Sequence, residues 1–411
     1  MKNLFYLTFL MILLSANVDA QKHKAYYDNG NLKETGKYKK DQAVKTWTFY
    51  HENGTISAQG LYVKGAKEGV WNYYHKNGKL KEVGQYQNGE ETGNWVAYYD
   101  NGQKDYEGMY NNGARTGNWR YYHNNGQLSD EGAFKNDQQT GTWKYYFESG
   151  ALSKVGDWTN NVASGEWKYY YENGKLEKSG SWANHKQTGT WTYYYKNGAV
   201  EQEGEYLEHK QTGKWTYYYE NGQVKKVGHW VEDENDGEWV YYHENGKLLK
   251  KGTWKMGKAT GHWVYYYENG NIEEEGDYND QGEQIGIWKY YYESGQIKKT
   301  GTWLGGHNSG AWTYYFENGK LEKTGSWDKG KAHGHWTYYT KEGAKVDEGE
   351  WVNGVQDGTW TYYYENGKIK EVGTWVNAKQ HGKWSYYDKN GKLEDVSEWS
   401  NGIFVGPWKD K

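Results

Sequence analysis

The sequence predicts an all-β repeat protein in which tandem β-hairpins form one elongated, twisted antiparallel sheet. Three observations predict this fold class: a tryptophan recurs at a fixed interval, an Asn-Gly or similar dipeptide follows it at a constant distance, and densely spaced aromatic residues lie between the two. The leading tryptophans are Trp47, Trp71, Trp95, Trp119, Trp143, Trp167, Trp191, Trp215, Trp239, Trp263, Trp288, Trp312, Trp336, Trp360, Trp384 and Trp408. Of the 15 intervals between them, 14 are 24 residues long and one is 25. About 16 copies of one repeat therefore set the architecture.

The first residues have the composition of a secretory signal. A basic residue precedes an apolar run from Leu4 to Leu14, and Val18 and Ala20 occupy the two small-residue subsites of a cleavage after Ala20. The apolar run is too short for a bilayer-spanning helix, which needs about 20 residues. We therefore expect residues 1–20 to be a signal peptide and residues 21–411 to form the repeat array of a secreted or periplasmic protein without a transmembrane segment.

The composition decides what kind of core the chain can build. Hydrophobic residues make up 35% of the sequence and aromatic residues 19%, so the 25 Trp and 45 Tyr must supply most of the buried surface. There is no cysteine to form a disulfide. Lys and Arg number 50 against 54 Asp and Glu, and the two signs are interspersed, which argues against a nucleic-acid partner.

Each repeat reads as one hairpin when its positions are numbered from the leading Trp, taken as position 0. In the copy that starts at Trp167, an aromatic strand runs into Asn-Gly at 173–174, the strongest short signal for a two-residue hairpin turn. The returning strand carries Leu176, then Gly180 at position +13, then Trp182. Every copy followed by a further strand has Tyr at position +3. Aromatic residues at this density favour a strand over a helix.

A two-residue turn fixes which side chains share a face. It pairs +4 with +9 and +2 with +11, and it places the leading Trp opposite the Gly at +13, so that the ring packs over a cross-strand glycine. One face then carries Trp167, Tyr169, Tyr171, Leu176, Gly180 and Trp182, and the other face is mainly charged. The unvarying Tyr at +3 falls on the charged face. Either these tyrosines form a ladder of their own, or a longer turn shifts the register by one residue.

The second glycine-bearing segment of each repeat, such as residues 88–93, varies most between copies and is expected to be an exposed loop between hairpins. An open sheet with one aromatic face needs a cover. Curling of the sheet, a second copy of the chain in a homo-oligomer, or a ligand would each provide one.

The pattern Gly-x-Trp-x-Tyr-Tyr-x-x-Asn-Gly-x-Leu, followed by Gly-x-Trp, resembles the MORN-repeat variant found in tandem in many bacterial proteins. The likeness covers residues 21–411. It implies an elongated, twisted antiparallel sheet of stacked hairpins, with roles in scaffolding and in binding proteins or membrane phospholipid. Some relatives are labelled antitoxins of toxin–antitoxin pairs. The repeats are also loosely similar to choline-binding cell-wall repeats, which have a shorter period.

No residue set apart from the repeat suggests catalysis, a cofactor or a metal site. His51, His75, His123 and His243 occupy position +4, where Tyr usually stands, and read as aromatic replacements. His333 and His335 are the best local pair for a metal, but they too read as a variant of the connecting loop. Tyrosines at +2 and +4 are the candidate binding surface: Tyr169, Tyr171, Tyr193, Tyr195, Tyr217 and Tyr219.

These observations predict a function without an active site. We expect an exported, non-enzymatic scaffold that binds a protein partner or the envelope surface. The alternative is a carbohydrate or cell-wall binding module that stacks an envelope glycan on Trp and Tyr rings.

Overall fold

The computed structural model describes residues 19–409, and in this range every helix or strand is a β-strand. No helix that could span a membrane occurs among these residues. Apart from its last two residues, the predicted signal peptide 1–20 lies outside the described part of the chain. The 33 strands belong to an antiparallel sheet, which confirms the predicted fold class of tandem hairpins.

The chain divides into two units, residues 1–186 and 187–411. The strands of the first unit are β1 (Gln21–Tyr26), β2 (Leu32–Lys39), β3 (Gln42–Tyr50), β4 (Ile56–Val63), β5 (Ala66–Tyr74), β6 (Leu80–Gln87), β7 (Glu90–Tyr98), β8 (Lys104–Asn111), β9 (Ala114–Tyr122), β10 (Leu128–Lys135), β11 (Gln138–Tyr146), β12 (Leu152–Thr159), β13 (Val162–Tyr170) and β14 (Leu176–Ala183). The strands of the second unit are β15 (Lys186–Tyr194), whose first residue closes the first unit, β16 (Val200–Leu207), β17 (Lys210–Tyr218), β18 (Val224–Val231), β19 (Glu234–Tyr242), β20 (Leu248–Lys255), β21 (Lys258–Tyr266), β22 (Ile272–Tyr278), β23 (Gln284–Tyr291), β24 (Ile297–Leu304), β25 (His307–Tyr315), β26 (Leu321–Asp328), β27 (Lys331–Tyr339), β28 (Lys345–Val352), β29 (Val355–Tyr363), β30 (Ile369–Val376), β31 (Lys379–Tyr387), β32 (Leu393–Ser400) and β33 (Ile403–Pro407).

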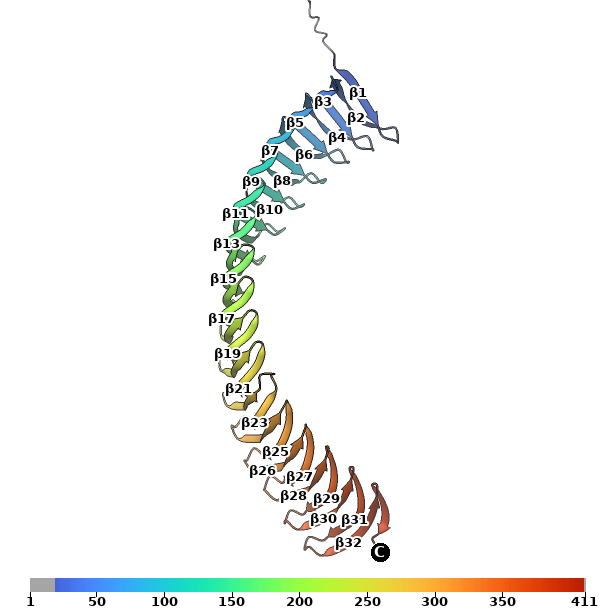
Figure 1. Ribbon diagram of the computed structural model, residues 1–411, viewed down its shortest axis with the longest axis vertical. Coiled ribbons are helices and arrows are strands. Elements are labelled where there is room, and N and C mark those ends of the chain that lie inside the picture. The colour runs from blue at the N-terminus through green and yellow to red at the C-terminus, as the bar shows by residue number, and fades with distance from the viewer. Residues whose placement is uncertain (1–18, 410–411) are drawn as a thin grey trace, which may run out of the picture. The chain divides into compact units, whose positions relative to one another are not determined.

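Within each unit the strands follow one another in chain order. β18, for example, pairs antiparallel with β17 on one side and with β19 on the other, and Figure 1 shows the hairpins of each unit in a row. Each hairpin therefore packs only against the hairpins before and after it, as expected of a repeat protein.

The Asn-Gly turn is longer than predicted. At residues 219–223, the Tyr219 amide donates to the Gln223 carbonyl at 2.8 Å, and the Gly222 amide donates to the Tyr219 carbonyl at 2.9 Å. These bonds enclose a three-residue loop, with Gly222 at φ +85° and the Asn221 side chain accepting a bond from the Gln223 amide at 2.9 Å. A type I turn closed by a left-handed glycine has this geometry. The two-residue turn is therefore wrong here, and the longer turn that the sequence left open is confirmed.

The two-residue turn lies at the second glycine-bearing segment instead. Asn88 and Gly89 have φ values of +53° and +90°, which is the combination that a type I′ hairpin turn requires. β7 then begins at Glu90. The exposed loop expected over residues 88–93 is therefore wrong for residues 90–93, which belong to this strand. Several first positions of this turn are Asn, which tolerates a left-handed backbone.

The longer Asn-Gly turn also settles the register. Trp215 lies opposite Gly228 and Tyr217 opposite Lys226, as predicted, but Tyr218 at +3 pairs with Val224 at +9 across a bulge at Lys225. Position +4 therefore starts the turn and does not belong to the aromatic face. The +3 tyrosines remain on the charged face, and in at least five hairpins the hydroxyl donates to a carboxylate of the preceding hairpin; Tyr218 donates to Glu203 at 2.7 Å.

The leading tryptophans form the core. All fifteen from Trp47 to Trp384 are at most 3% exposed. A cross-strand glycine receives fourteen of these rings, but it belongs to the preceding hairpin: a Cβ on Gly204 would overlap the Trp215 ring. The bulge at Gly213, with φ +65°, precedes this tryptophan, and Nε1 of Trp215 donates to the Glu205 carbonyl at 3.1 Å.

The last hairpin departs from this rule. Its +13 residue is Ser397, which is 3% exposed and pairs with Pro407 of β33. Its Oγ accepts a bond from Trp399 Nε1 at 2.8 Å. A serine therefore stands where the other hairpins have glycine, and the leading tryptophan that follows it, Trp408, is only partly buried.

Candidate functional site: the aromatic face

The aromatic face is the sheet face that carries positions 0, +2, +11 and +15 of each repeat. In the second unit, leading Trp and +2 Tyr rings alternate along this face. Trp215 and Tyr217 lie 6.0 Å apart between ring centroids, and Tyr217 and Trp239 lie 6.3 Å apart. Similar near-parallel neighbours continue through later hairpins, for example at Tyr290 and Trp312. The face is thus built from rings in regular order.

The +15 residue fixes the +2 tyrosine from the side. Trp230 stands almost perpendicular to Trp239, with an angle of 83° and a centroid distance of 5.6 Å. Its Nε1 donates to the Tyr217 hydroxyl at 3.1 Å. Burial raises the pKa of Tyr217, so the phenol stays protonated at neutral pH. The +2 rings are therefore held in place, with one part of each ring still accessible to solvent.

The six tyrosines predicted as a binding surface fall into two sets. Those at +2, Tyr169 in the first unit and Tyr193 and Tyr217 in the second, are half-buried on the aromatic face. Those at +4, which are Tyr171, Tyr195 and Tyr219, stand at the start of the turns. The structure therefore does not bring the six together, and a binding role for them stays a prediction.

Position +4 connects neighbouring hairpins. The Tyr195 hydroxyl donates to the Tyr218 carbonyl at 2.7 Å, and the Tyr219 hydroxyl donates to the Tyr242 carbonyl at 2.8 Å. Where histidine replaces tyrosine, as at His51, Nε2 lies 2.9 Å from the Tyr74 carbonyl. The same contact explains why these histidines act as aromatic replacements.

A set of lysines on the aromatic face was missed by the sequence reasoning. At +11, opposite the +2 tyrosine, a half-buried lysine lies over that ring in six hairpins: Lys154, Lys178, Lys226, Lys250, Lys299 and Lys323. Nζ of Lys226 lies 4.1 Å from the Tyr217 centroid and 5.1 Å from that of Trp239. The predicted pairing of +2 with +11 contained this information, because paired residues share a face.

One hairpin of the first unit breaks the ring order. Ala97 replaces the +2 aromatic residue, and Tyr106 stands opposite it at +11. The Tyr106 ring lies 5.7 Å from the Trp119 ring, in the place where the +2 ring of other hairpins contacts the next leading tryptophan. The Tyr106 hydroxyl donates to Glu82. A shallow groove of about 440 Å³ lies beside these residues. Tyr106 fills the space that Ala97 leaves, so the groove is a local consequence of this exchange.

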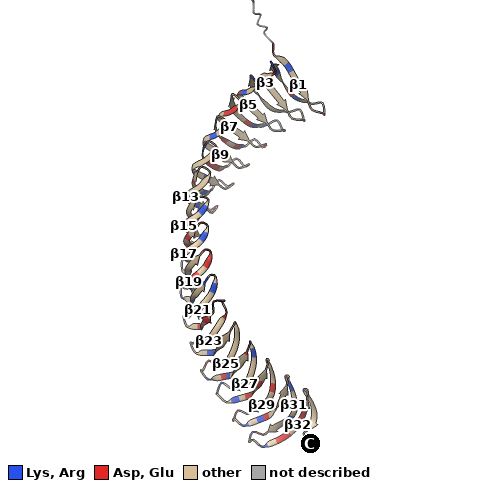
Figure 2. Cartoon of the chain, in the orientation of Figure 1, with Lys and Arg blue, Asp and Glu red and all other residues tan. Residues whose placement is uncertain are grey.

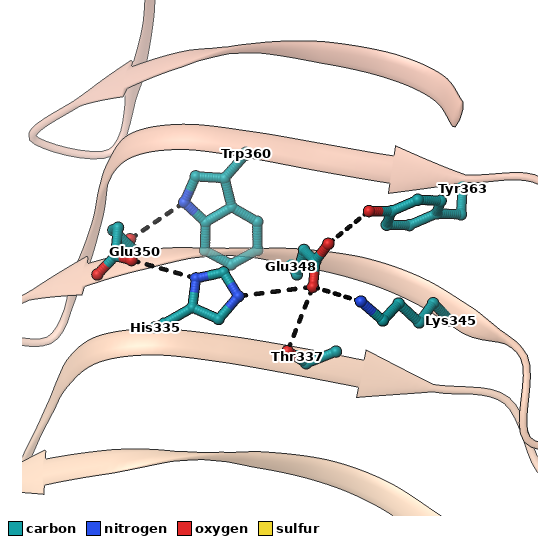
Figure 3. Close-up of polar contacts among 7 residues, drawn as sticks. All are labelled: His335, Thr337, Lys345, Glu348, Glu350, Trp360 and Tyr363. Carbon is teal, nitrogen blue, oxygen red and sulfur yellow. Dashed lines mark hydrogen bonds and ion pairs between the residues drawn. The ribbon is translucent and has the colours of Figure 1, made fainter. Parts of the chain in front are cut away.

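The opposite face holds a polar cluster (Figure 3). Glu348 in β28 accepts hydrogen bonds from Lys345 at 2.8 Å and from the Tyr363 hydroxyl, and His335 Nε2 lies 3.5 Å from it. Burial opposes ionisation of Glu348, but the bonds from Lys345 and Tyr363 outweigh it and lower its pKa to about 2. Nδ1 of His335 lies 3.1 Å from Glu350. The cluster connects three neighbouring strands, and its polar groups bind one another.

The histidine pair proposed for a metal lies in β27 rather than in a loop. His333 and His335 are separated by Gly334, which has φ +70°. Among residues 19–409, no group of three or more potential ligands is arranged to hold a metal ion. Elsewhere, Lys, Arg, Asp and Glu are interspersed along the strands of both units (Figure 2).

The solved structures that match this chain show low similarity to it. They include the crystal structures of TcdB2-TccC3 and TcdB2-TccC3-Cdc42, at 12% and 11% identity and a TM-score of 0.15 each, with 93% of this chain and 26% of those chains covered. The Tc holotoxin pore of Photorhabdus luminescens matches at 12% identity and a TM-score of 0.15, covering 94% of this chain and 24% of that one. The chain thus spans about a quarter of each of these proteins. No curated protein matches it.

The model of the MORN repeat variant matches most of the chain. The matched segments are residues 22–40, 44–64, 67–88, 91–112, 115–136, 163–184, 187–208, 211–232, 235–256, 259–280, 284–304, 309–329, 356–377 and 380–401. The hairpin of the Glu348 cluster falls in the unmatched stretch between residues 329 and 356. The matches follow the hairpins seen in the structure, and the chain belongs to the MORN repeat variant family.

Proposed function

We propose that this chain is an exported, non-enzymatic repeat scaffold that holds a protein partner or the envelope surface along its aromatic face. The observation that carries the proposal is that rings at different repeat positions are buried to different extents. The leading tryptophans are fully buried, whereas the +2 tyrosines and +15 tryptophans are only partly buried, in a regular series. A continuous series of partly exposed rings along one face is typical of an interaction surface.

Deletion of whole repeats tests this function. Removal of residues 215–262 takes out two repeats and joins Lys214 to Trp263, which preserves every type of strand pairing. Since each hairpin contacts only its neighbours, the shortened chain is expected to stay folded and to bind its partner more weakly. Removal of residues 215–226 is the matched control. It takes out half a repeat and reverses the direction of all later strands, so it should unfold the chain.

The partner is sought by capture. Immobilised residues 21–411 are incubated with envelope proteins and, separately, with insoluble wall material from the source cell. Recovery of a defined protein, weakened by the two-repeat deletion, supports the scaffold. Equal recovery by the folded deletion variant would contradict a distributed aromatic surface.

Carbohydrate binding is the second candidate, because the half-exposed rings lie beside hydrogen-bonding phenols and lysines on the same face. Aromatic rings with polar tips suit ligands that are both apolar and hydroxylated. A shift of Trp emission on adding polysaccharide tests this candidate, and flat titrations across neutral and acidic glycans would remove it.

A further inference from the structure

The lysine row of the second unit is defined as Lys226, Lys250, Lys299 and Lys323, and it carries positive charge that no direct ion pair neutralises. Among the described residues 19–409, none of the four ammonium groups forms an ion pair with a carboxylate. Glu274 favours the charged form of Lys299 from a distance. Burial lowers the pKa of Lys226, Lys250 and Lys299, so each holds its charge against a desolvation cost. An anion placed on the face would offset that cost.

The row is also bounded along the chain. In the second unit, position +11 changes from lysine to carboxylate after Lys323, with Asp347, Glu371 and Asp395 in the last three hairpins. Gln202 precedes the row. In the second unit, lysine therefore occupies four of the five +11 positions from 226 to 323, with Glu274 between them, and in the first unit it occurs at Lys154 and Lys178. Cation–π packing on the tyrosines does not by itself explain this distribution, because the last three hairpins pair the same +2 tyrosine with a carboxylate.

From these observations we infer that the lysine row binds an acidic polysaccharide, with a carboxylate-bearing sugar at each lysine. The inference rests on the proposed function and specifies the ligand of the same aromatic face. Each Nζ would pair with a sugar carboxylate, while the flanking +2 and +15 rings would contact the apolar faces of the sugars.

The spacing of the row favours a glycan over a polypeptide. Equivalent lysines on adjacent hairpins, such as Lys226 and Lys250, are two strands apart, which is roughly 9.6 Å. That spacing is close to the length of one disaccharide in an extended glycan, so acidic groups on alternate sugars would meet successive lysines. An extended peptide instead presents side chains on one side about every 6.7 Å, and its acidic groups would fall out of step.

The twist of the sheet disfavours a flat membrane as the ligand. Two strands add a rotation of about 40° to the face, so successive lysines point in different directions. A bilayer surface would meet only one or two of them at a time, whereas a flexible linear chain can follow the rotation.

The test uses residues 21–411 and a hyaluronan decasaccharide, in which glucuronate alternates with a neutral sugar. We expect binding that weakens with rising salt and a loss of roughly tenfold or more in affinity for Lys226→Gln/Lys250→Gln. Gln202 occupies the same position in the natural chain, so this variant should fold. The control is Lys214→Gln/Lys251→Gln, which removes the same charge from two exposed lysines of the opposite face and should bind as the parent does.

Glu274→Lys supplies a gain-of-function arm. Glu274 interrupts the row between Lys250 and Lys299, and its replacement should tighten binding of the decasaccharide. Unchanged affinity in the lysine double variant would overturn the inference, and so would equal binding of a neutral chitin oligosaccharide.

Two further outcomes would also overturn it. Binding to anionic lipid vesicles or to polyglutamate, with none to hyaluronan, would assign the row to another ligand. Sedimentation that shows a dimer dissociated by the lysine substitutions would assign it to a second copy. If hyaluronan does not bind while captured proteins still depend on the repeats, the inference fails and the scaffold function stands.

Discussion

The ring of Trp215 lies directly on Gly204 of the preceding hairpin, so closely that a side chain at residue 204 would occupy the space of the indole. The two residues come from different repeats, and their contact joins one hairpin to the next. Because the tryptophan is fully buried, the ring cannot move toward solvent without opening the core.

Gly204→Ala is expected to destabilise the second unit by about 1–3 kcal/mol, because overpacking a closed core costs this much. The measurement is urea unfolding followed by Trp fluorescence. The control is Glu205→Ala, which changes an exposed side chain next to Gly204 in the same strand. A loss as large in the control would contradict the role assigned to the Trp–Gly contact.

The exchange between Ala97 and Tyr106 predicts strong coupling. Ala97→Tyr alone should cost about 1–3 kcal/mol, since the Tyr106 ring already fills the site. Adding Tyr106→Lys restores the usual +2 and +11 pair of this chain and should recover most of the loss. A double-mutant cycle measures the coupling, and additive effects would show that the two rings do not compete for one space.

The Glu348 cluster predicts a stability change in acid. The folded-state pKa of Glu348 is about 2, below the ordinary value near 4.5, so its contribution is present above about pH 4.5 and is lost as the pH falls toward 2. Glu348→Gln should therefore lower stability at neutral pH and flatten its dependence below pH 4.5, as followed by thermal unfolding. Glu365→Gln, in an exposed turn, is the control. If the stability of Glu348→Gln falls as steeply below pH 4.5 as that of the parent, the assignment is contradicted.

Tyr218 predicts a change at the alkaline end. Burial and the hydrogen bond to Glu203 raise its pKa to about 12. A raised pKa means that the stabilising contribution is complete below about pH 10 and is lost as the pH rises through 12. Ultraviolet titration of tyrosinate should show late ionisation, and Tyr218→Phe should remove part of that late phase. Titration of all tyrosines near pH 10 in the folded protein would rule this out.

The repeat period was sufficient to predict the fold class, the hairpins and the pairing of Trp215 with Gly228, because side chains alternate across strands. The two-residue turn predicted at Asn-Gly was wrong and the longer turn left open as the alternative is the one found, while the two-residue turn lies where an exposed loop was expected. Both turns contain Asn and Gly in many copies, as at 77–78 and 88–89, and dipeptide composition does not distinguish a two-residue turn from a three-residue turn. The length of each turn is decided by how each strand pairs with the strands on both of its sides.

The candidate site was less predictable for a related reason. The +4 tyrosines were assigned to the aromatic face because the shorter turn places them there, and one extra residue in the loop moves Tyr219 to the edge of the sheet. Lys226 was overlooked because a lysine reads as solvent-exposed in sequence. Its aliphatic stem covers an aromatic ring while the ammonium group remains at the surface.

Ser397 sets the rule for how an array of this kind could lengthen. Trp408 follows Ser397 at the distance at which Trp215 follows Gly204, but it is only partly buried, whereas Trp215 is buried. Whole repeats duplicated inside the array meet glycine on both sides and fit without further change. An array extended beyond Trp408 with the same tryptophan packing would need glycine at residue 397.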